Sequence, residues 1–108
     1  MADRPVKVYI PNKSAHDFSD AKRVGELVFI TSGTQPLFSV NNMHRVCEEA
    51  LKDSSPNDYI LHSGLNILCS MLCSVFAVKH GRLNLLIWRN DRYLKREVVL
   101  RDDLEEDV

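Results

Sequence analysis

Residues 58–88 read DYILHSGLNILCSMLCSVFAVKHGRLNLLIW, and this stretch decides the fold. A short apolar run at 59–61 is followed, after a polar turn, by an uncharged helical run from about 65 to 78. Basic residues close that run, and Gly81 supplies a residue that can take positive φ. A second apolar run of strand length follows at 83–88. Two such runs joined by one helix predict a β-α-β unit with parallel strands and a right-handed crossover.

Two strands are predicted before this unit. Apolar residues alternate at 6–10, and Pro11-Asn12 is expected to end that strand. Residues 26–30 carry consecutive apolar side chains, which is typical of a strand covered on both faces in the interior of an α/β sheet. A short helix is expected between them at 19–24, with Asp17 or Ser19 as its cap.

An amphipathic helix is predicted at 42–53, because Met43, Val46, Cys47, Ala50 and Leu51 form one stripe. After the central unit, the turn at 89–92 predicts a hairpin whose second strand, 93–100, returns antiparallel as a charged edge. The sequence therefore predicts a small Rossmann-like three-layer α/β domain over residues 1–100. It has about four parallel strands and one antiparallel edge strand, and residues 101–108 form an acidic, frayed tail.

Composition narrows the function classes. The chain has 108 residues and a net charge of −1, so it suits one domain without a broad basic face for nucleic acid.

Its three cysteines have no CxxC spacing and fall in helical patterns, which predicts free, buried thiols in a reducing compartment. The polar start lacks a signal peptide pattern, so we expect a cytoplasmic protein. Residues 59–78 carry no charge, but polar residues interrupt them, which favours a buried strand and helix over a membrane span.

The loops after three predicted parallel strands gather small polar groups. In an open parallel sheet these loops share one edge, where ligands bind. The candidate ligand-binding residues are Lys13, Ser14, His16, Thr31, Ser32, Gly33, His62, Ser63, Gly64 and Asn66.

The third loop, at residues 62–66, has the strongest features of an anion-binding site. Ser63 is the expected N-cap of the 65–78 helix, so nearby amides and the helix dipole could hold a phosphate or carboxylate. Lys13 would add a positive charge from the neighbouring loop. The alternative is that Ser63-Gly64 is only a cap and a tight turn. Neither GxGxxG nor GxxxxGK[ST] occurs, which argues against a dehydrogenase or a P-loop NTPase, and we expect no cofactor.

His16 with Asp17 is the one weak catalytic candidate, because a histidine near a phosphate can act as acid or base. A polar loop that caps the following turn is the plainer interpretation. His16, Asp17 and His62 have no metal-ligand spacing, so no metal site is expected. Buried thiols have raised pKa values, which argues against Cys69 and Cys73 as nucleophiles.

The 65–78 helix is apolar on most sides, which predicts a homodimer through it; cover by the N-terminal loop is the alternative. We expect a small-molecule-binding protein for a nucleotide or nucleotide-derived anion, with a sensor or sequestering role and without catalysis. The first alternative is a phosphoryl-handling or hydrolytic enzyme that uses the same loops. The second is a module that binds a protein partner, as an inhibitor or adaptor. Nucleic acid and membrane are not expected as partners.

Overall fold

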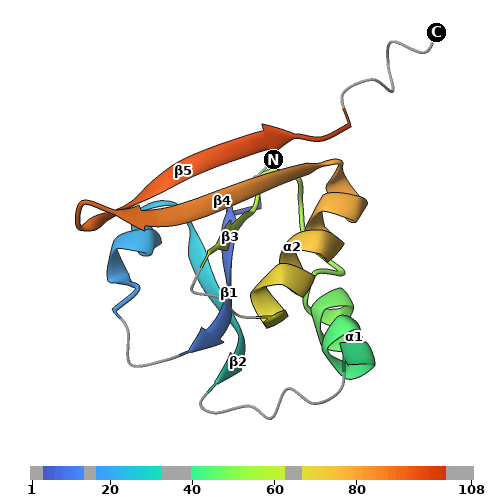
Figure 1. Ribbon diagram of the computed structural model, residues 1–108. Coiled ribbons are helices and arrows are strands. Elements are labelled where there is room, and N and C mark those ends of the chain that lie inside the picture. Colours follow the sequence, from blue (N-terminus) through green and yellow to red (C-terminus); the bar gives the residue numbers. More distant parts are fainter. Residues whose placement is uncertain (1–3, 14–16, 33–39, 63–66, 102–108) are drawn as a thin grey trace, which may run out of the picture.

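Residues 4–13, 17–32, 40–62 and 67–101 are described by the computed structural model, and five strands within them form one mixed sheet (Figure 1). The elements, in chain order, are β1 (Lys7–Lys13), the 3-10 helix η1 (Ser19–Arg23), β2 (Glu26–Ser32), α1 (Val40–Ala50), β3 (Tyr59–Leu61), α2 (Ile67–His80), β4 (Arg82–Arg89) and β5 (Arg92–Val99). The strands lie in the order β2-β1-β3-β4-β5. β1 to β4 run parallel and β5 pairs antiparallel with β4, which confirms the predicted α/β class and the antiparallel edge strand.

The central β-α-β unit closely follows its prediction. β3 spans the predicted residues, and α2 lies two residues further along the chain than the predicted 65–78. The amphipathic helix was predicted at 42–53, whereas α1 ends at Ala50. Hydrogen-bonded turns continue beyond it, because the Leu51 amide donates to Cys47 O at 3.0 Å and the Ser54 amide to Leu51 O at 3.0 Å.

The prediction that Pro11 ends the first strand is wrong, since β1 continues through it to Lys13. β1 pairs with β3 at Val8 and Tyr9 and with β2 on its other side as far as Lys13. In a parallel ladder, successive residues direct their amides to alternate neighbours. Pro11 lacks the amide that would extend the pairing toward β3, so it limits that pairing while β1 continues beside β2.

β2 is an edge strand, which corrects its predicted place in the sheet interior. Its apolar residues still divide between the two faces of the sheet. Leu27 and Phe29 pack against the cluster on the η1 side, whereas Val28 and Ile30 pack against the cluster under the helices. The consecutive apolar residues of β2 therefore indicate that both faces of the strand are covered. They do not indicate whether β2 has one neighbouring strand or two.

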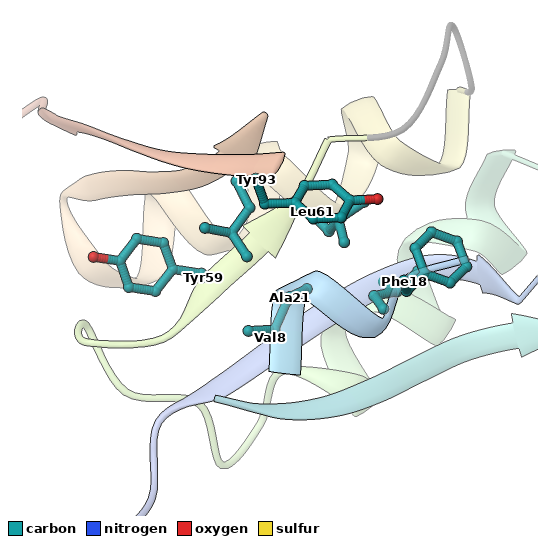
Figure 2. Packing of buried hydrophobic residues seen from close by; sticks show 8 residues of the cluster. Val8, Phe18, Ala21, Tyr59, Leu61 and Tyr93 are labelled. Atoms are coloured by element: carbon teal, nitrogen blue, oxygen red, sulfur yellow. The ribbon is translucent and has the colours of Figure 1, made fainter. Parts of the chain in front are cut away.

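Two hydrophobic clusters fill the two faces of the sheet. The cluster on the η1 side is made by Val8, Ile10, Phe18, Ala21, Tyr59, Leu61, Leu86 and Tyr93. Figure 2 shows side chains of this cluster coming from β1, β3, β5 and the η1 segment. The cluster on the helix side is made by Tyr9, Met43, Cys47, Leu51, Ile60, Leu68, Leu72 and Phe76. α1 and α2 thus cover one face and η1 covers the other (Figure 1).

α2 finds cover for its apolar sides within this chain. Leu68, Leu72 and Phe76 are buried in the helix-side cluster, and Met71 and Val75 are half-buried against it. Its outer side retains Ile67 and Val78, which are 49% and 77% exposed. In the helix-side cluster this cover comes from the sheet and the α1 segment, and not from the N-terminal loop that was the alternative to a dimer. A dimer through α2 stays a prediction.

Residues with positive φ close both ends of β4. Gly81 has φ 70° between α2 and β4, and its carbonyl accepts hydrogen bonds from the amides of Leu100 and Arg101 at 2.8 and 2.9 Å. Asn90 and Asp91, with φ 54° and 64°, form the two-residue turn to β5. Two left-handed residues match the twist of a two-residue hairpin, so the sequence-based turn prediction is confirmed.

Asp58 is fully buried at the amino end of β3 and organises the base of the sheet. Arg4 donates to its two carboxylate oxygens at 2.8 and 2.9 Å. The amide of Lys7 donates to Oδ1 at 3.0 Å, and the amide of Ser55 donates to Oδ2 at 2.9 Å. Burial alone would raise the pKa of Asp58, but these donors together hold its pKa below the ordinary value. Asn84 Nδ2 adds bonds to Pro56 O and Asp58 O at 2.7 and 2.8 Å.

We predict that Asp58→Ala lowers the free energy of unfolding by about 3 kcal/mol, because two amides at the base of the sheet lose their acceptor. Urea unfolding followed by circular dichroism measures this loss. Asp53→Ala is the matched control, since it removes a carboxylate from an exposed position in the same connection. Equal losses in the two variants would contradict the central role of Asp58.

Candidate functional site

The carboxyl ends of β1, β2 and β3 lie at one edge of the sheet, and the direction of the chain path changes between β1 and β3. After β1 the chain adds β2 on one side, whereas after β3 it adds β4 on the other. A crevice outside the strand ends is expected where the order reverses in this way. Among the described residues, Asn12, Lys13, Thr31 and His62 stand at these ends.

Thr31 and Asn12 join the ends of β2 and β1. The Thr31 hydroxyl lies 2.9 Å from Pro11 O and 2.8 Å from Asn12 Oδ1. One hydroxyl carries one proton, so it serves the two acceptors alternately. Both side chains are half-buried. The pair therefore presents neutral hydrogen-bonding groups, held in place by the pairing of Asn12 with Thr31 in the sheet.

Lys13 lies on the β2 side of β1. Its ammonium group is 5.4 Å from the centre of the Phe29 ring, within the range of a cation–π contact. A groove of about 350 Å³ opens here, and Lys13, Asp17, Phe18, Ser19, Lys22, Leu27 and Phe29 line it. The predicted approach of Lys13 to the turn after β3 stays a prediction, because residues 63–66 lie outside the described part of the chain. Two lysines, Lys13 and Lys22, line this groove on the η1 side.

η1 is held in position by bonds to the hairpin. Asp20 Oδ2 accepts a hydrogen bond from the Tyr93 amide at 2.7 Å, and Arg23 donates to Tyr93 O. The hydrogen bond from the Tyr93 amide and the Arg23 guanidinium together hold the pKa of Asp20 below its ordinary value. Asp17 Oδ1 accepts a hydrogen bond from the Ser19 amide at 2.9 Å. The N-cap of η1 is Phe18, which makes no side-chain cap bond, so the prediction that Asp17 or Ser19 caps this helix is wrong. Lys22 and Ser19 thus reach the groove because η1 is fixed on this face.

Six of the predicted ligand-binding positions lie outside the described residues. These are Ser14, His16, Gly33, Ser63, Gly64 and Asn66. The backbone of Ser32 ends β2. His62 is exposed after β3, and its amide donates to Leu86 O of β4 at 3.0 Å. The structure thus brings Asn12 and Thr31 into contact and leaves Lys13 and His62 at the ends of neighbouring strands.

Sequence reasoning missed Lys22, Ser19 and Phe29 as neighbours of this edge. Each was assigned to a short helix or a core strand, where nothing in the local pattern points to a ligand. Their common location follows from the connection between β1 and β2, which crosses the η1 face of the sheet. Only the strand order, which the sequence left open, could have indicated it.

A serine and a histidine meet at the opposite edge of the sheet. Ser54 Oγ lies 2.8 Å from His80 Nε2 and also donates to Leu51 O at 2.7 Å. Because the Ser54 hydroxyl donates its proton to Leu51 O, the imidazole of His80 donates to Ser54 Oγ. A histidine that activates a serine as a nucleophile would instead accept the proton of the serine. Lys79 adds a bond to Lys52 O at 3.0 Å. The contact therefore fastens the end of α2 to the turn after α1.

We predict that the folded state loses stability as the pH falls below about 6.5, the ordinary pKa of histidine. Burial, and then the charge of Lys79, lower the pKa of His80, although Asp58 acts in the opposite direction. The unfolded chain therefore binds the proton more readily, and protonation below pH 6.5 favours unfolding. Urea unfolding at pH 7 and pH 5 should show a smaller loss in His80→Gln than in the wild type. Parallel losses in the two proteins would refute this assignment.

The three cysteines are in the thiol form, without a disulfide, and lie in or beside the contact between α1 and α2. Burial raises the pKa of Cys47 to about 11, and the neighbouring Cys69 adds to the shift. A hydrogen bond with Cys69, together with burial, also raises the pKa of Cys73. Thiols in this state are poor nucleophiles at neutral pH, as the sequence indicated. They act as small packing residues.

Two larger grooves lie away from the strand ends. One of about 410 Å³ runs between α1 and α2 over Leu51, Met71 and Val75. The other, of about 550 Å³, lies between β2 and α1. Neither contains a residue that the sequence proposed for ligand binding.

Two further findings concern the described part of the chain. Its histidine, cysteine, aspartate and glutamate side chains form no group of three that could hold a metal ion. Its helices are all too short or too polar to cross a membrane.

Comparison with known proteins gives a family. Neither the curated proteins nor the solved structures yielded a match to this chain. A family model described as phage Pam3 gp32-like protein matches residues 6–101, which is most of the sequence. The chain therefore belongs to the phage Pam3 gp32-like family.

Proposed function

We propose that this member of the phage Pam3 gp32-like family is a Rossmann-like binding protein for a small anionic ligand of the nucleotide class. The ligand would sit at the carboxyl edge of the sheet, outside β1 and β3. Its role would be that of a sensor or a sequestering protein, without turnover of the ligand. The thiol form of the three cysteines supports a reducing, cytoplasmic compartment for this role.

The reversal of strand order between β1 and β3 carries this proposal. The order of the parallel strands, β2-β1-β3-β4, is the one in which doubly wound proteins bind ligands between the first and third strands. Here that crevice is bordered by Asn12 and Lys13 on one side and His62 on the other. The base of the sheet is occupied by the Asp58 network, which supports the opposite edge as the place for a ligand.

The available groups suit an anion. Lys13 is exposed and can exchange its contact with Phe29 for a phosphate, because a single cation–π contact at an exposed site is worth only about 0.5–1 kcal/mol. Lys22 lines the same groove and adds a second positive charge. Thr31 and Asn12 offer hydroxyl and amide groups for sugar or base atoms. A charged end and a neutral polar end together favour a nucleotide over a simple inorganic anion.

The test is a thermal-shift screen of the purified chain against mononucleotides, dinucleotides, cyclic nucleotides and inorganic phosphate. A ligand at 100 times its Kd stabilises the folded state by roughly 2.7 kcal/mol, which raises Tm measurably. We predict a shift with at least one nucleotide and its loss in Lys13→Gln. Lys7→Gln is the matched control, because Lys7 stands at the opposite end of the same strand.

The outcomes separate the proposed function from its alternatives. A shift that survives in Lys13→Gln but disappears in Lys7→Gln would place the site at the amino edge of the sheet and contradict the proposed location. Conversion of the bound nucleotide during incubation would favour the phosphoryl-handling enzyme. The absence of a shift with every compound would refute nucleotide binding.

A further inference from the structure

The two edge strands of the sheet differ in how they are protected. β5 carries charged residues along its length, including Arg92, Lys95, Arg96 and Glu97. Charges on an edge strand discourage pairing with another chain. β2 has the uncharged run Leu27 to Thr31 instead, and β1 is its sole strand neighbour among the described residues. β2 therefore lacks the protection that the opposite edge possesses.

The backbone groups that β2 presents outward can be assigned from its pairing. The Glu26 amide donates to Val6 O on the β1 side at 2.9 Å. Because amide and carbonyl groups alternate in direction along a parallel strand, Val28 and Ile30 also face β1. Leu27, Phe29 and Thr31 consequently direct their amides and carbonyls away from the sheet.

A groove of about 550 Å³ accompanies this edge on the helix side. Val28 and Ile30 of β2 form one wall, and Val46 and Ala50 of α1 form the other. Two charged residues of α1, Arg45 and Glu49, line the same groove and are exposed. They lie four residues apart on one side of α1, with opposite charges.

We propose that a second copy of this chain pairs with β2, antiparallel and about a twofold axis at Phe29. The two sheets would then form one continuous sheet across the dimer. Phe29 would exchange both of its outward hydrogen bonds with the partner's Phe29, and Leu27 would do so with the partner's Thr31. Val28 would face the partner's Ile30, and Glu26 would face the partner's Ser32, so the two paired strands place no like charges opposite each other. Aromatic and β-branched cross-strand pairs of this kind are favourable.

Charge complementarity selects a second copy as the occupant. A twofold axis at Phe29 places the two α1 helices antiparallel on the same side of the joined sheet. Arg45 then faces the partner's Glu49, and Glu49 faces the partner's Arg45, which is the reciprocity that a twofold interface requires. Glu49 already pairs with Lys52 at 2.8 Å, so the new contact would enlarge an exposed charge network. The proposal goes beyond ligand binding and does not depend on it.

The test is a charge swap followed by sedimentation velocity over a range from micromolar to near-millimolar protein. The wild type should be dimeric at the upper end. Arg45→Glu and Glu49→Arg should each weaken the dimer, by about tenfold in Kd, because each places like charges opposite one another twice. The double variant R45E/E49R should restore the wild-type Kd. Glu48→Arg makes the same charge change on the α2 side of α1 and should leave the Kd unchanged.

Amide hydrogen exchange identifies the surface that pairs. In the dimer, the amides of Leu27, Phe29 and Thr31 should become protected as protein concentration rises. The amides of Val28 and Ile30 already face β1 and serve as the internal control. A monomer at every concentration would overturn the proposal, and so would failure of the double variant to restore pairing. A dimer in which the Leu27, Phe29 and Thr31 amides exchange as in the monomer would also overturn it.

Discussion

The buried carboxylate of Asp58 is the constraint on which the rest of the sheet depends. It satisfies the amides of Lys7 and Ser55 and the guanidinium of Arg4, so it joins the start of β1 to the connection before β3. Asn84 extends the same network to β4 through Pro56 O and Asp58 O. A buried charge is tolerated only when its oxygens are bonded in this way, and the bonds in turn fix three strands at one edge.

The Asp58 network occupies the amino edge of the sheet, and the proposed ligand site lies at the opposite edge. Loops that follow parallel strands can vary while the strands themselves stay in register. In this chain the groups at that edge belong to different contacts: Thr31 with Asn12, Lys13 with Phe29, and His62 with β4. Each contact joins a strand to its neighbour, and no salt bridge links these contacts to one another among the described residues. A ligand that bridges them would supply the missing connection.

The parts of the fold that the sequence predicts well are those governed by local pattern. The periodicity of α2, the apolar run of β3 and the Asn90-Asp91 turn depend on neighbouring residues alone. Pro11 and β2 were misjudged because their meaning depends on which strand lies beside them, and a single sequence does not encode that locally. The same dependence on neighbouring strands explains why the sequence predicted only part of the candidate site. Lys13 and Thr31 could be proposed from their loops, but Lys22 and the buried role of Asp58 appear only after the chain is folded.

The place of β1 has a consequence for how the chain acquires its structure. β1 is made first, yet it lies between β2 and β3 and touches both. During synthesis it can pair with β2 early, but one of its sides must wait until β3 leaves the ribosome, and Arg4 meets Asp58 across 54 positions. Contacts between distant positions form slowly, because the entropy cost of closing the intervening loop comes before the stabilising bond is made. The nascent chain therefore passes through a stage in which an apolar strand has one open side, and that side is covered only after the middle third of the chain has been made.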